Sequence, residues 1–582
     1  MVYGKMNGNT SGKPAVNAYV RMIKDMFQII PIKIALIIFL NGAHAASYVL
    51  VMYASQIFFD QITHISETDP LNKLIFFFVL FLLASIFAEM INGLSNFPIE
   101  FLPPEVIAAM HGRIQKKADH VEPILFEKTD FLEMLDQAKR GVEGCVRSSL
   151  FVLYIVTFYV PYFILMAVYL RSMSPLLTMS LLFVFIPVII SQTARIRLSE
   201  TVDEQTISAR READYYEKIL CDRAFAKEIR LFGMYYFFKN KWAEKNTQTN
   251  DIKMKAEIRH AKMDLVLRSI TICGYLGILF LLVHELLSSQ ITVGIFAAVF
   301  GNIGIMYGLA SEVFGGVMRN ITRSAVYVKN YQAFIDLPDK AAKNPTTDCG
   351  DILFENVSFI YPNAAAPSLA QINLHIYEGE TIAIVGENGA GKTTLVKLLL
   401  GLYEPSEGTI MNSHKNTAVF QNFQHYKMSL KDNIVLSSPD SDIRLTEVLA
   451  KAGLNLCEET YPMKENTILS VEFGGIDLSG GQWQKIAMAR GLYKEHDLIV
   501  LDEPTAAIDP VEETRILKNF AEVSKGRTTI IVTHRLGAGK LADRILVLKQ
   551  GHIDDIGTHE QLMRKNGYYA KLYHEQAKWY TS

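Results

Sequence analysis

The chain has 582 residues, of which 50% are hydrophobic, 11% aromatic and 20% charged, and its formal net charge is −2. This composition excludes a disordered or fibrous protein, and the charge argues against nucleic-acid binding steered by global charge. At roughly 150 residues per domain, the length predicts about four domains. Residues 1–20 are polar, so no cleavable signal peptide is expected. Five cysteines lack paired spacing, which argues against a disulfide framework and a zinc site: Cys145, Cys221, Cys273, Cys349 and Cys457.

Apolar stretches are concentrated in the first half of the chain, and six of them carry almost no charged side chains. A helix that spans a bilayer needs about 20 mainly apolar residues. The second and fifth stretches, residues 74–88 and 269–283, reach that length when Glu89, His284 or Glu285 lies near a membrane surface. Helices in the core of a soluble protein seldom repeat such lengths, so the pattern predicts six membrane-spanning helices within residues 34–59, 74–88, 148–170, 172–194, 269–283 and 286–311.

The connections between these stretches predict their orientation. Residues 60–73 form a short acidic connection, and Arg171 alone separates the third stretch from the fourth. By contrast, residues 94–147 and 195–263 are long, charged and helical in pattern, and the second segment is rich in Lys and Arg. Basic segments are retained on the cytoplasmic side of a membrane. We therefore expect both long segments to extend into the cytoplasm as helical hairpins.

Composition changes after residue 335. Residues 336–350 contain two prolines and a glycine and have no apolar period, which is typical of a linker. Beyond them, strand-like runs such as 381–385 and 498–501 alternate with helical ones. The predicted organisation is an α-helical membrane domain over residues 1–335, a linker over 336–350, and an α/β nucleotide-binding domain with a P-loop over 351–582.

Residues 386–393 read GENGAGKT and fit the phosphate-loop pattern G-x-x-x-x-G-K-[ST], between a strand-like run and a helical one. Glycines allow backbone N–H groups to surround phosphate oxygens. We expect Lys392 to reach the β- and γ-phosphates of ATP and the Thr393 hydroxyl to bind Mg²⁺. The other predicted contacts in this loop are Gly386, Asn388, Gly389, Ala390, Gly391 and Thr394.

The apolar run 498–501 ends in Asp502 and Glu503. Asp502 is placed to hold Mg²⁺, and Glu503 can polarise the attacking water. His534 follows a further apolar run and is a candidate contact to the γ-phosphate. A solvated acidic turn and a structural histidine would give the same patterns, but the phosphate loop upstream favours the catalytic interpretation.

Residues 478–482 read LSGGQ and resemble the signature of ATP-binding cassette (ABC) transporters. With the phosphate loop, the carboxylate pair and the histidine in this order, the chain resembles an ABC half-exporter, in which six spans precede one cassette. The resemblance implies that Tyr361 stacks on adenine and that Gln421 senses the γ-phosphate and Mg²⁺. It also implies that Asp509 takes the acidic position of the D-loop.

The signature opens a helix, whose N-terminus offers N–H donors and a partial positive charge to an anion. In the family this helix faces the phosphate loop of a partner cassette. The resemblance therefore implies that Ser479, Gly481 and Gln482 contact ATP bound to another chain. Because one chain has one phosphate loop and one signature, it implies a homodimer with two ATP sites, and a heterodimer is the alternative.

Two segments resemble the coupling elements of the family, near residues 126–134 and within 211–232. For the first, a solvated charged helix is the alternative. The second segment, together with Trp483 just after the signature, resembles lantibiotic and bacteriocin exporters. Two residues depart from the family pattern: Ala506 where a serine is common, and Phe473 where many exporters carry a glutamate.

The resemblance implies ATP-driven export of an amphipathic peptide across the bacterial plasma membrane, with the cassette in the cytoplasm. Export of a lipid or a drug, an ATP-gated ATPase that does not pump, and an importer remain alternatives. Ionisable residues in or near the spans are scarce, and such groups usually face a cavity or the protein interior. His44 and Glu312 are the stronger candidates for a cargo path, ahead of Glu89 and Arg268.

Overall fold

The structure is a computed structural model. It describes residues 15–63, 71–173, 175–313, 317–340, 350–362, 364–439, 445–456, 460–503, 526–534, 540 and 542–581, apart from some side chains, mostly between 173 and 207. The chain divides into two compact units. The first contains Met1–His120 and Leu132–Pro338, and the second contains Val121–Phe131 and Asp339–Ser582. A short segment within the predicted membrane domain therefore groups with the cassette.

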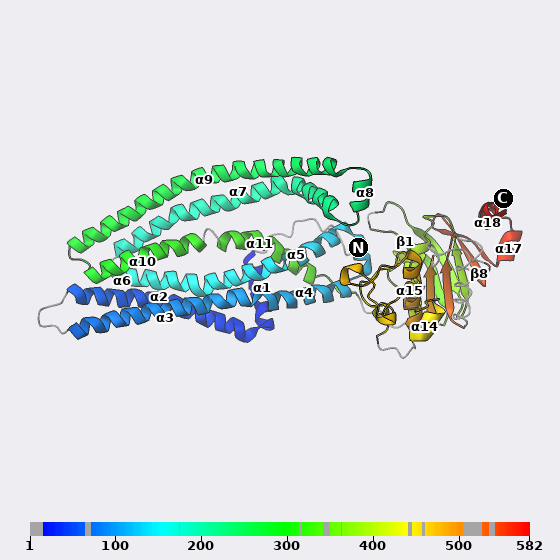
Figure 1. The fold of residues 1–582 in the computed structure, drawn as a ribbon, viewed down its shortest axis with the longest axis horizontal. Coiled ribbons are helices and arrows are strands. Elements are labelled where there is room, and N and C mark those ends of the chain that lie inside the picture. The colour runs from blue at the N-terminus through cyan, green and yellow to red at the C-terminus, as the bar shows by residue number, and fades with distance from the viewer. Residues whose placement is uncertain are drawn as a thin grey trace. The chain divides into compact units, whose positions relative to one another are not determined.

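The first unit is helical, and long helices run beside one another along its length (Figure 1). Several are apolar around their whole circumference, as expected of helices inside a membrane or a large core. The described helices of this unit are α1 (Ala15–Ile29), α2 (Pro31–Thr63), α3 (Leu71–Phe101), α4 (Pro103–His120), α5 (Thr129–Tyr154), α6 (Val160–Met173), α7 (Pro175–Cys221), α8 (Ala226–Leu231), α9 (Tyr235–Leu287), α10 (Val293–Glu312) and α11 (Met318–Ile335).

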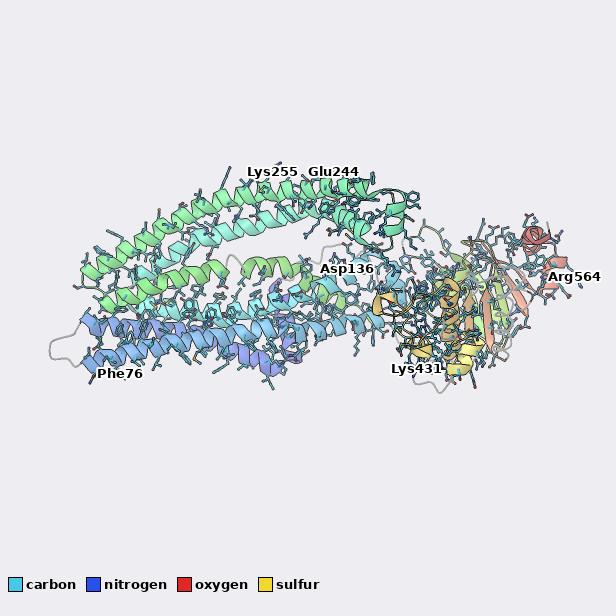
Figure 2. All side chains as sticks on the ribbon, viewed as in Figure 1. Phe76, Asp136, Glu244, Lys255, Lys431 and Arg564 are labelled. Carbon is cyan, nitrogen blue, oxygen red and sulfur yellow. The ribbon has the colours of Figure 1, made fainter. Side chains whose placement is uncertain are left out.

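Five helical stretches among the described residues are long and apolar enough to cross a membrane, namely Pro31–Thr63, Leu71–His120, Thr129–Ser172, Tyr235–Leu287 and Val293–Glu312. They contain the predicted first, second, third and fifth spans, and Val293–Glu312 contains residues 293–311 of the predicted sixth span, 286–311. The predicted fourth span, residues 172–194, falls mainly in α7, where most of its side chains lie outside the described part of the structure. Within this unit, the labelled charged residues Asp136, Glu244 and Lys255 lie away from the end that carries Phe76 (Figure 2).

Two breaks interrupt the long helices, as the sequence predicted. The first occupies the turn between α4 and α5, where the 3₁₀ helix η1 spans Pro123–Glu127. It lies slightly before the predicted segment 126–134, most of which belongs to α5. The second break follows Cys221 and contains the short helix α8. Helix α1 was not predicted: Tyr19, Met22 and Met26 lie on its buried face, and the Tyr19 hydroxyl donates to the Ile321 carbonyl at 2.6 Å.

The second unit contains two sheets (Figure 1). The antiparallel sheet has the order β2-β1-β4, built from β1 (Ile352–Phe359), β2 (Leu369–Ile376) and β4 (Glu407–Met411). The larger sheet has the order β5-β6-β7-β3-β8-β9 and is parallel except for β9. Its strands are β3 (Thr381–Val385), β5 (Asn416–Val419), β6 (Leu498–Asp502), β7 (Thr528–Val532), β8 (Arg544–Lys549) and β9 (His552–Gly557).

The inner strands of the larger sheet are buried on both faces, which explains why β6 and β7 read as continuous rather than alternating apolar runs. One core cluster joins both sheets to α12 (Lys392–Leu399). A second packs β5 and β6 against α15 (Gly480–Tyr493). The remaining described helices are α13 (Leu430–Val435), α14 (Leu445–Lys451), the 3₁₀ turns η4 (Lys464–Asn466) and η5 (Val471–Phe473), α17 (His559–Arg564) and α18 (Tyr568–Thr581).

Candidate nucleotide site

The predicted phosphate loop connects β3 to the N-terminus of α12, in the strand–loop–helix context that the motif requires. Gly389 and Gly391 have φ angles of 80° and 101°, in the left-handed region that favours glycine. A Cβ atom on Gly386 would lie 2.3 Å from the Leu548 carbonyl oxygen, so this position also requires glycine. The side chain of Asn388 is exposed at the loop, whereas that of Ala390 is buried beneath it. Of these two predicted contacts, Asn388 is therefore the more accessible to a nucleotide.

Lys392 is the first residue of α12 and is 6% exposed. Its ammonium donates to the carbonyl oxygens of Gly386 and Glu387, both at 2.9 Å, so the side chain folds back along the loop. Burial lowers the pKa of Lys392, against the attraction of Glu503 and Asp502. The ammonium group is therefore held in the loop, where an anionic ligand would restore its charge balance.

Asp502 ends β6 and is 4% exposed. The Thr393 hydroxyl lies 3.4 Å from its Oδ2 atom. Burial, together with the neighbouring Glu503, raises the pKa of Asp502 to about 6. A buried carboxylate beside a hydroxyl is an oxygen set that suits Mg²⁺, and the charge of a cation would lower that pKa again. The residues predicted to bind Mg²⁺ through these two groups thus fit the ion.

Glu503 brings together residues that follow three neighbouring strands. Its Oε2 atom accepts from Gln421 Nε2 at 2.7 Å, and its Oε1 atom lies 2.6 Å from His534 Nε2. Gln421, Glu503 and His534 follow β5, β6 and β7, whose carboxyl ends meet at one edge of the parallel sheet. Glu503 therefore contacts both of the other predicted catalytic side chains.

The electrostatics of this cluster favour a neutral imidazole. Burial lowers the pKa of His534, and the nearby Lys392 lowers it further, although Glu503 acts in the opposite direction. The ring also hydrogen-bonds the backbone of Gly386. His534 therefore links the carboxylate of Glu503 to the first glycine of the phosphate loop without contributing a full positive charge near neutral pH.

Tyr361, the predicted adenine contact, follows β1 and is partly buried. Its hydroxyl lies 3.2 Å from Thr394 Oγ1, so a loop residue predicted to touch ATP also fixes the position of this ring. The Tyr361 ring meets Tyr403 edge-on at a centroid distance of 6.0 Å. Lys397 Nζ lies 5.8 Å from the Tyr361 centroid and 4.9 Å from that of Tyr403.

A carboxylate from the segment Val121–Phe131 joins this aromatic group. Glu127 Oε1 accepts from the Tyr403 hydroxyl and lies 3.1 Å from Lys397 Nζ. The hydrogen bond from Tyr403 and the contact with Lys397 lower the pKa of Glu127, whereas burial raises that of Tyr403 to about 12. Sequence analysis missed this group because Glu127 and Lys397 are 270 residues apart, and no local motif signals the pairing.

The signature lies at the N-terminus of α15. Ser479 is the N-cap residue and forms a capping box with Gln482, which follows from the S-x-x-Q spacing. The Gln482 Oε1 atom accepts from the Ser479 backbone N–H at 2.9 Å, so this side chain caps its own helix. Ser479 is exposed and Gly481 is partly buried at this helix end, whose orphan N–H groups favour an anion.

Trp483 connects the signature helix to the residues that follow Gln421. It is 4% exposed and stacks on His425, with ring centroids 4.4 Å apart and planes 4° from parallel. Arg490, farther along α15, donates to the Asn433 carbonyl at 2.9 Å and lies over the Tyr426 ring. The tryptophan therefore packs inside the cassette.

The remaining predicted positions belong to the D-loop and to the segment before the signature. Asp509 and Ala506 of the D-loop lie outside the described residues. Phe473 is 63% exposed, and the adjacent Glu472 pairs with Lys427 at 2.6 Å. The carboxylate that many exporters carry at the position of Phe473 is thus replaced by an exposed ring beside an ion pair.

Comparisons with known proteins agree with this geometry. The sequence model of the family described as "ABC transporter" matches residues 369–506. The chain is 28% identical to the subtilin transport ATP-binding protein SpaT of Bacillus subtilis, over 90% of this chain and 88% of that protein. It is 40% identical to the nisin transport ATP-binding protein NisT of Lactococcus lactis, over 39% of this chain and 41% of that protein.

Two further comparisons concern lipid transport and the fold. The chain is 30% identical to an ATP-dependent lipid A-core flippase of Chromohalobacter salexigens, over 60% of this chain and 62% of that protein. A solved bacterial Atm1-family ABC exporter with ATP bound shares the fold, with a TM-score of 0.76, 21% identity, and coverage of 96% of this chain and 100% of that one. Residues 369–506 are therefore an ABC transporter domain, joined to a helical domain that contains several apolar helices of membrane-spanning length, and the similarity to transporters over most of the chain indicates ATP hydrolysis coupled to transport.

Proposed function

We propose that this protein exports an amphipathic peptide from the cytoplasm across the bacterial plasma membrane, as a homodimer that alternates between inward-open and outward-open states. The observation that carries the hydrolytic part is the Glu503 carboxylate between Gln421 and His534. The cargo rests on similarity to SpaT, which spans most of both chains, whereas the flippase match covers 60% of this chain.

In the proposed reaction, Tyr361 stacks on adenine and the phosphate loop binds the phosphates, with Lys392 at the β- and γ-phosphate oxygens. Glu503 accepts a proton from the attacking water, because its carboxylate is held by Gln421 on one oxygen and by His534 on the other. His534, whose Nε2 atom contacts Glu503, would lie beside the γ-phosphate. Thr393, Asp502 and Gln421 would hold Mg²⁺, which neutralises charge on the β- and γ-phosphates when bound.

The second half of each site comes from the partner in this proposal. Ser479 and Gly481 at the start of α15 would bind the γ-phosphate of ATP held by the other chain, and Asp509 would lie at the contact between the cassettes. Gln482 supports this role indirectly, because its capping contacts fix the Ser479 backbone. ATP would then join the two cassettes, and hydrolysis would release them.

The cargo assignment is tested by transport. In inside-out vesicles supplied with ATP, we expect labelled amphipathic peptides to accumulate and to stimulate ATP hydrolysis at saturating concentrations, because cargo binding shifts a two-state equilibrium. Matched vesicles with Glu503→Gln serve as the control for energised uptake. Flipping of a fluorescent lipid, or accumulation of a drug, without a response to any peptide would overturn peptide export and leave a lipid or drug exporter.

A further inference from the structure

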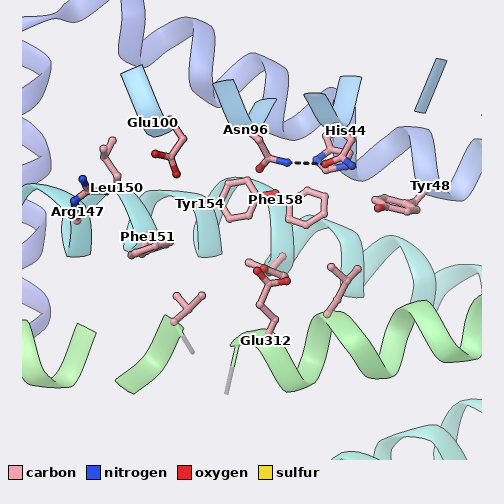
Figure 3. A pocket seen from close by; sticks show the side chains of 14 residues that line it. His44, Tyr48, Asn96, Glu100, Arg147, Leu150, Phe151, Tyr154, Phe158 and Glu312 are labelled. Carbon is pink, nitrogen blue, oxygen red and sulfur yellow. Dashed lines mark hydrogen bonds between the residues drawn. The ribbon is translucent and has the colours of Figure 1, made fainter. Parts of the chain in front are cut away.

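The first unit contains a cavity of about 400 Å³ among α2, α3, the α5–α6 region and α10 (Figure 3). Ligand pockets in proteins commonly enclose about 300–1,000 Å³, so the cavity can hold one bulky side chain with its polar head or a small molecule. Its lining includes aromatic rings together with amide and carboxylate side chains. Such a combination fits a ligand with an apolar body and a polar group.

The aromatic wall comes from an irregular stretch of helix. The π-helical turn η2 (Ile155–Tyr159) follows α5, and its Phe158 ring stacks on Tyr154 at 4.9 Å and on His44 at 4.3 Å. Single π-helical turns inside α-helices are frequent at functional sites, because the extra residue redirects side chains. In Figure 3 the Tyr154 and Phe158 rings lie side by side facing His44.

His44 supplies an unused polar atom at this wall. Its side chain is 2% exposed, and Nδ1 lies 3.0 Å from the Ser95 hydroxyl. Its Nε2 atom is buried and has no hydrogen-bond partner among the described residues. Buried polar atoms are nearly always satisfied, so an orphaned ring nitrogen in a cavity wall is a position at which a ligand would form a hydrogen bond.

The charges around the cavity are mainly negative. Glu312 at the end of α10 accepts from the Tyr159 hydroxyl, and Glu100 of α3 lines the same space. Among the described lining residues the single Lys or Arg is Arg147, whose Nε atom lies 3.0 Å from Glu143, so its charge is already paired. Glu89 adds a third carboxylate beside the wall, 3.3 Å from the Asn92 amide.

We propose that this cavity is a cargo subsite for a cationic amine carried next to an apolar or aromatic group, as in a Lys-containing amphipathic peptide. This inference rests on the proposed function and specifies the chemical class of the transported cargo. The apolar part packs on Tyr154 and Phe158, and the ammonium group pairs with Glu312, while Glu100 supplies a second carboxylate of the lining. The His44 Nε2 atom receives a hydrogen bond from an ammonium or peptide N–H.

The same charges disfavour the alternative cargo. An anionic lipid head group would meet two carboxylates and a guanidinium that is already paired, so like charges would repel it. A cation flanked by aromatic rings gains ion pairing and cation–π attraction at the same place. The site therefore discriminates by charge, which a wholly apolar cavity would not do.

The test uses the full-length protein in proteoliposomes and measures, for each variant, the peptide concentration that gives half-maximal ATPase stimulation. The probe is a synthetic amphipathic peptide of Leu, Trp and Lys, and its partner is the same peptide with acetylated lysines. We expect Glu312→Gln to raise the half-maximal concentration about tenfold for the lysine peptide and to leave that of the acetylated peptide unchanged, since hydrogen bonds to charged groups are the stronger ones.

Three further variants separate charge from folding. Glu312→Asp retains the carboxylate and should stay closer to the wild type than Glu312→Gln. Glu100→Gln should also weaken stimulation, because Glu100 lines the same cavity, and it provides an independent test if Glu312→Gln fails to assemble. Glu257→Gln removes an exposed carboxylate of α9 outside the cavity and should leave all values unchanged.

The outcomes distinguish this inference from the proposed function. If both peptide forms are transported with equal half-maximal concentrations in the wild type and in Glu312→Gln, the subsite is wrong although peptide export stands. If tetraphenylphosphonium stimulates ATP hydrolysis in a Glu312-dependent manner and no peptide does, the cavity binds a small organic cation and the proposed peptide cargo is wrong. Stimulation by anionic lipid alone would overturn both.

Discussion

At the scale of single residues, Glu503 shows how the cassette positions a reactive side chain. Its φ angle is 49°, in a region that a residue with a Cβ atom adopts at a cost of about 1–3 kcal/mol. The surrounding contacts hold it there: the backbone N–H donates to the Val532 carbonyl at 3.0 Å, and the carboxylate lies between Gln421 and His534. The strained backbone lets two successive acidic residues reach one edge of the sheet.

Replacing Glu503 by Gln should lower the rate of ATP hydrolysis by a factor of about 10²–10⁴, because the isosteric amide cannot accept the proton of the attacking water. Nucleotide binding should persist, since the phosphate loop is unchanged, and a closed cassette dimer should accumulate. Phosphate release and binding of a fluorescent ATP analogue measure the two effects. Glu495→Gln, at an exposed site before β6, is the matched control. Hydrolysis near the wild-type rate in Glu503→Gln would remove Glu503 from the role of base.

At the scale of elements, the segment Val121–Phe131 is joined along the chain to α4 and α5 but packs within the cassette unit. Ile124 contacts the core cluster between the two sheets, and Glu127 binds Tyr403 and Lys397. Tyr403 and Lys397 in turn pack beside the ring of Tyr361. The segment therefore contributes to the packing around the proposed adenine contact.

We expect Glu127→Gln to reduce the stimulation of ATP hydrolysis by cargo and to raise the KM for ATP, because the neutral amide holds Lys397 and Tyr403 less firmly. The cost in folding stability should be below about 1 kcal/mol, since the carboxylate is largely exposed and screened by solvent. Glu122→Gln on the same segment is the control. A variant with reduced stability but an unchanged KM and unchanged stimulation would show that the contact is only structural.

At the scale of the whole molecule, each chain holds one phosphate loop and one signature helix. We propose that the phosphate loop of one chain faces the signature helix of its partner. The signature end of α15 is accessible in the single chain, as a surface that binds a second nucleotide site must be. Its N-terminal N–H groups and capped geometry suit a phosphate delivered from outside the chain.

Chains with Lys392→Ala and chains with Ser479→Arg should each be nearly inactive as homodimers. Mixed dimers should regain activity from one intact site, because the first variant supplies a sound signature and the second a sound phosphate loop. Differently tagged chains allow the mixed dimer to be purified and its ATP hydrolysis measured. Purified mixed dimers without activity would contradict independent sites built in trans.

The parts of the candidate nucleotide site could be predicted from the sequence because each is local. The glycines of the phosphate loop, the apolar strand before Asp502 and Glu503, and the S-x-x-Q spacing at the signature each fix a short stretch of backbone through neighbouring residues. The lengths of the apolar runs likewise predicted the five candidate membrane spans found among the described residues. Short-range sterics and hydrophobic periodicity are sufficient for these features.

The tertiary structure decided which distant side chains meet. Glu127 reaches Lys397 across 270 residues, and His44, Phe158 and Glu312 line one cavity from separate helices. Helix α1 escaped prediction because it is short and amphipathic, and its apolar face is buried by packing against α11, α2 and α4. Such contacts depend on how whole helices and sheets pack, and residue order along the chain carries no local signal for them.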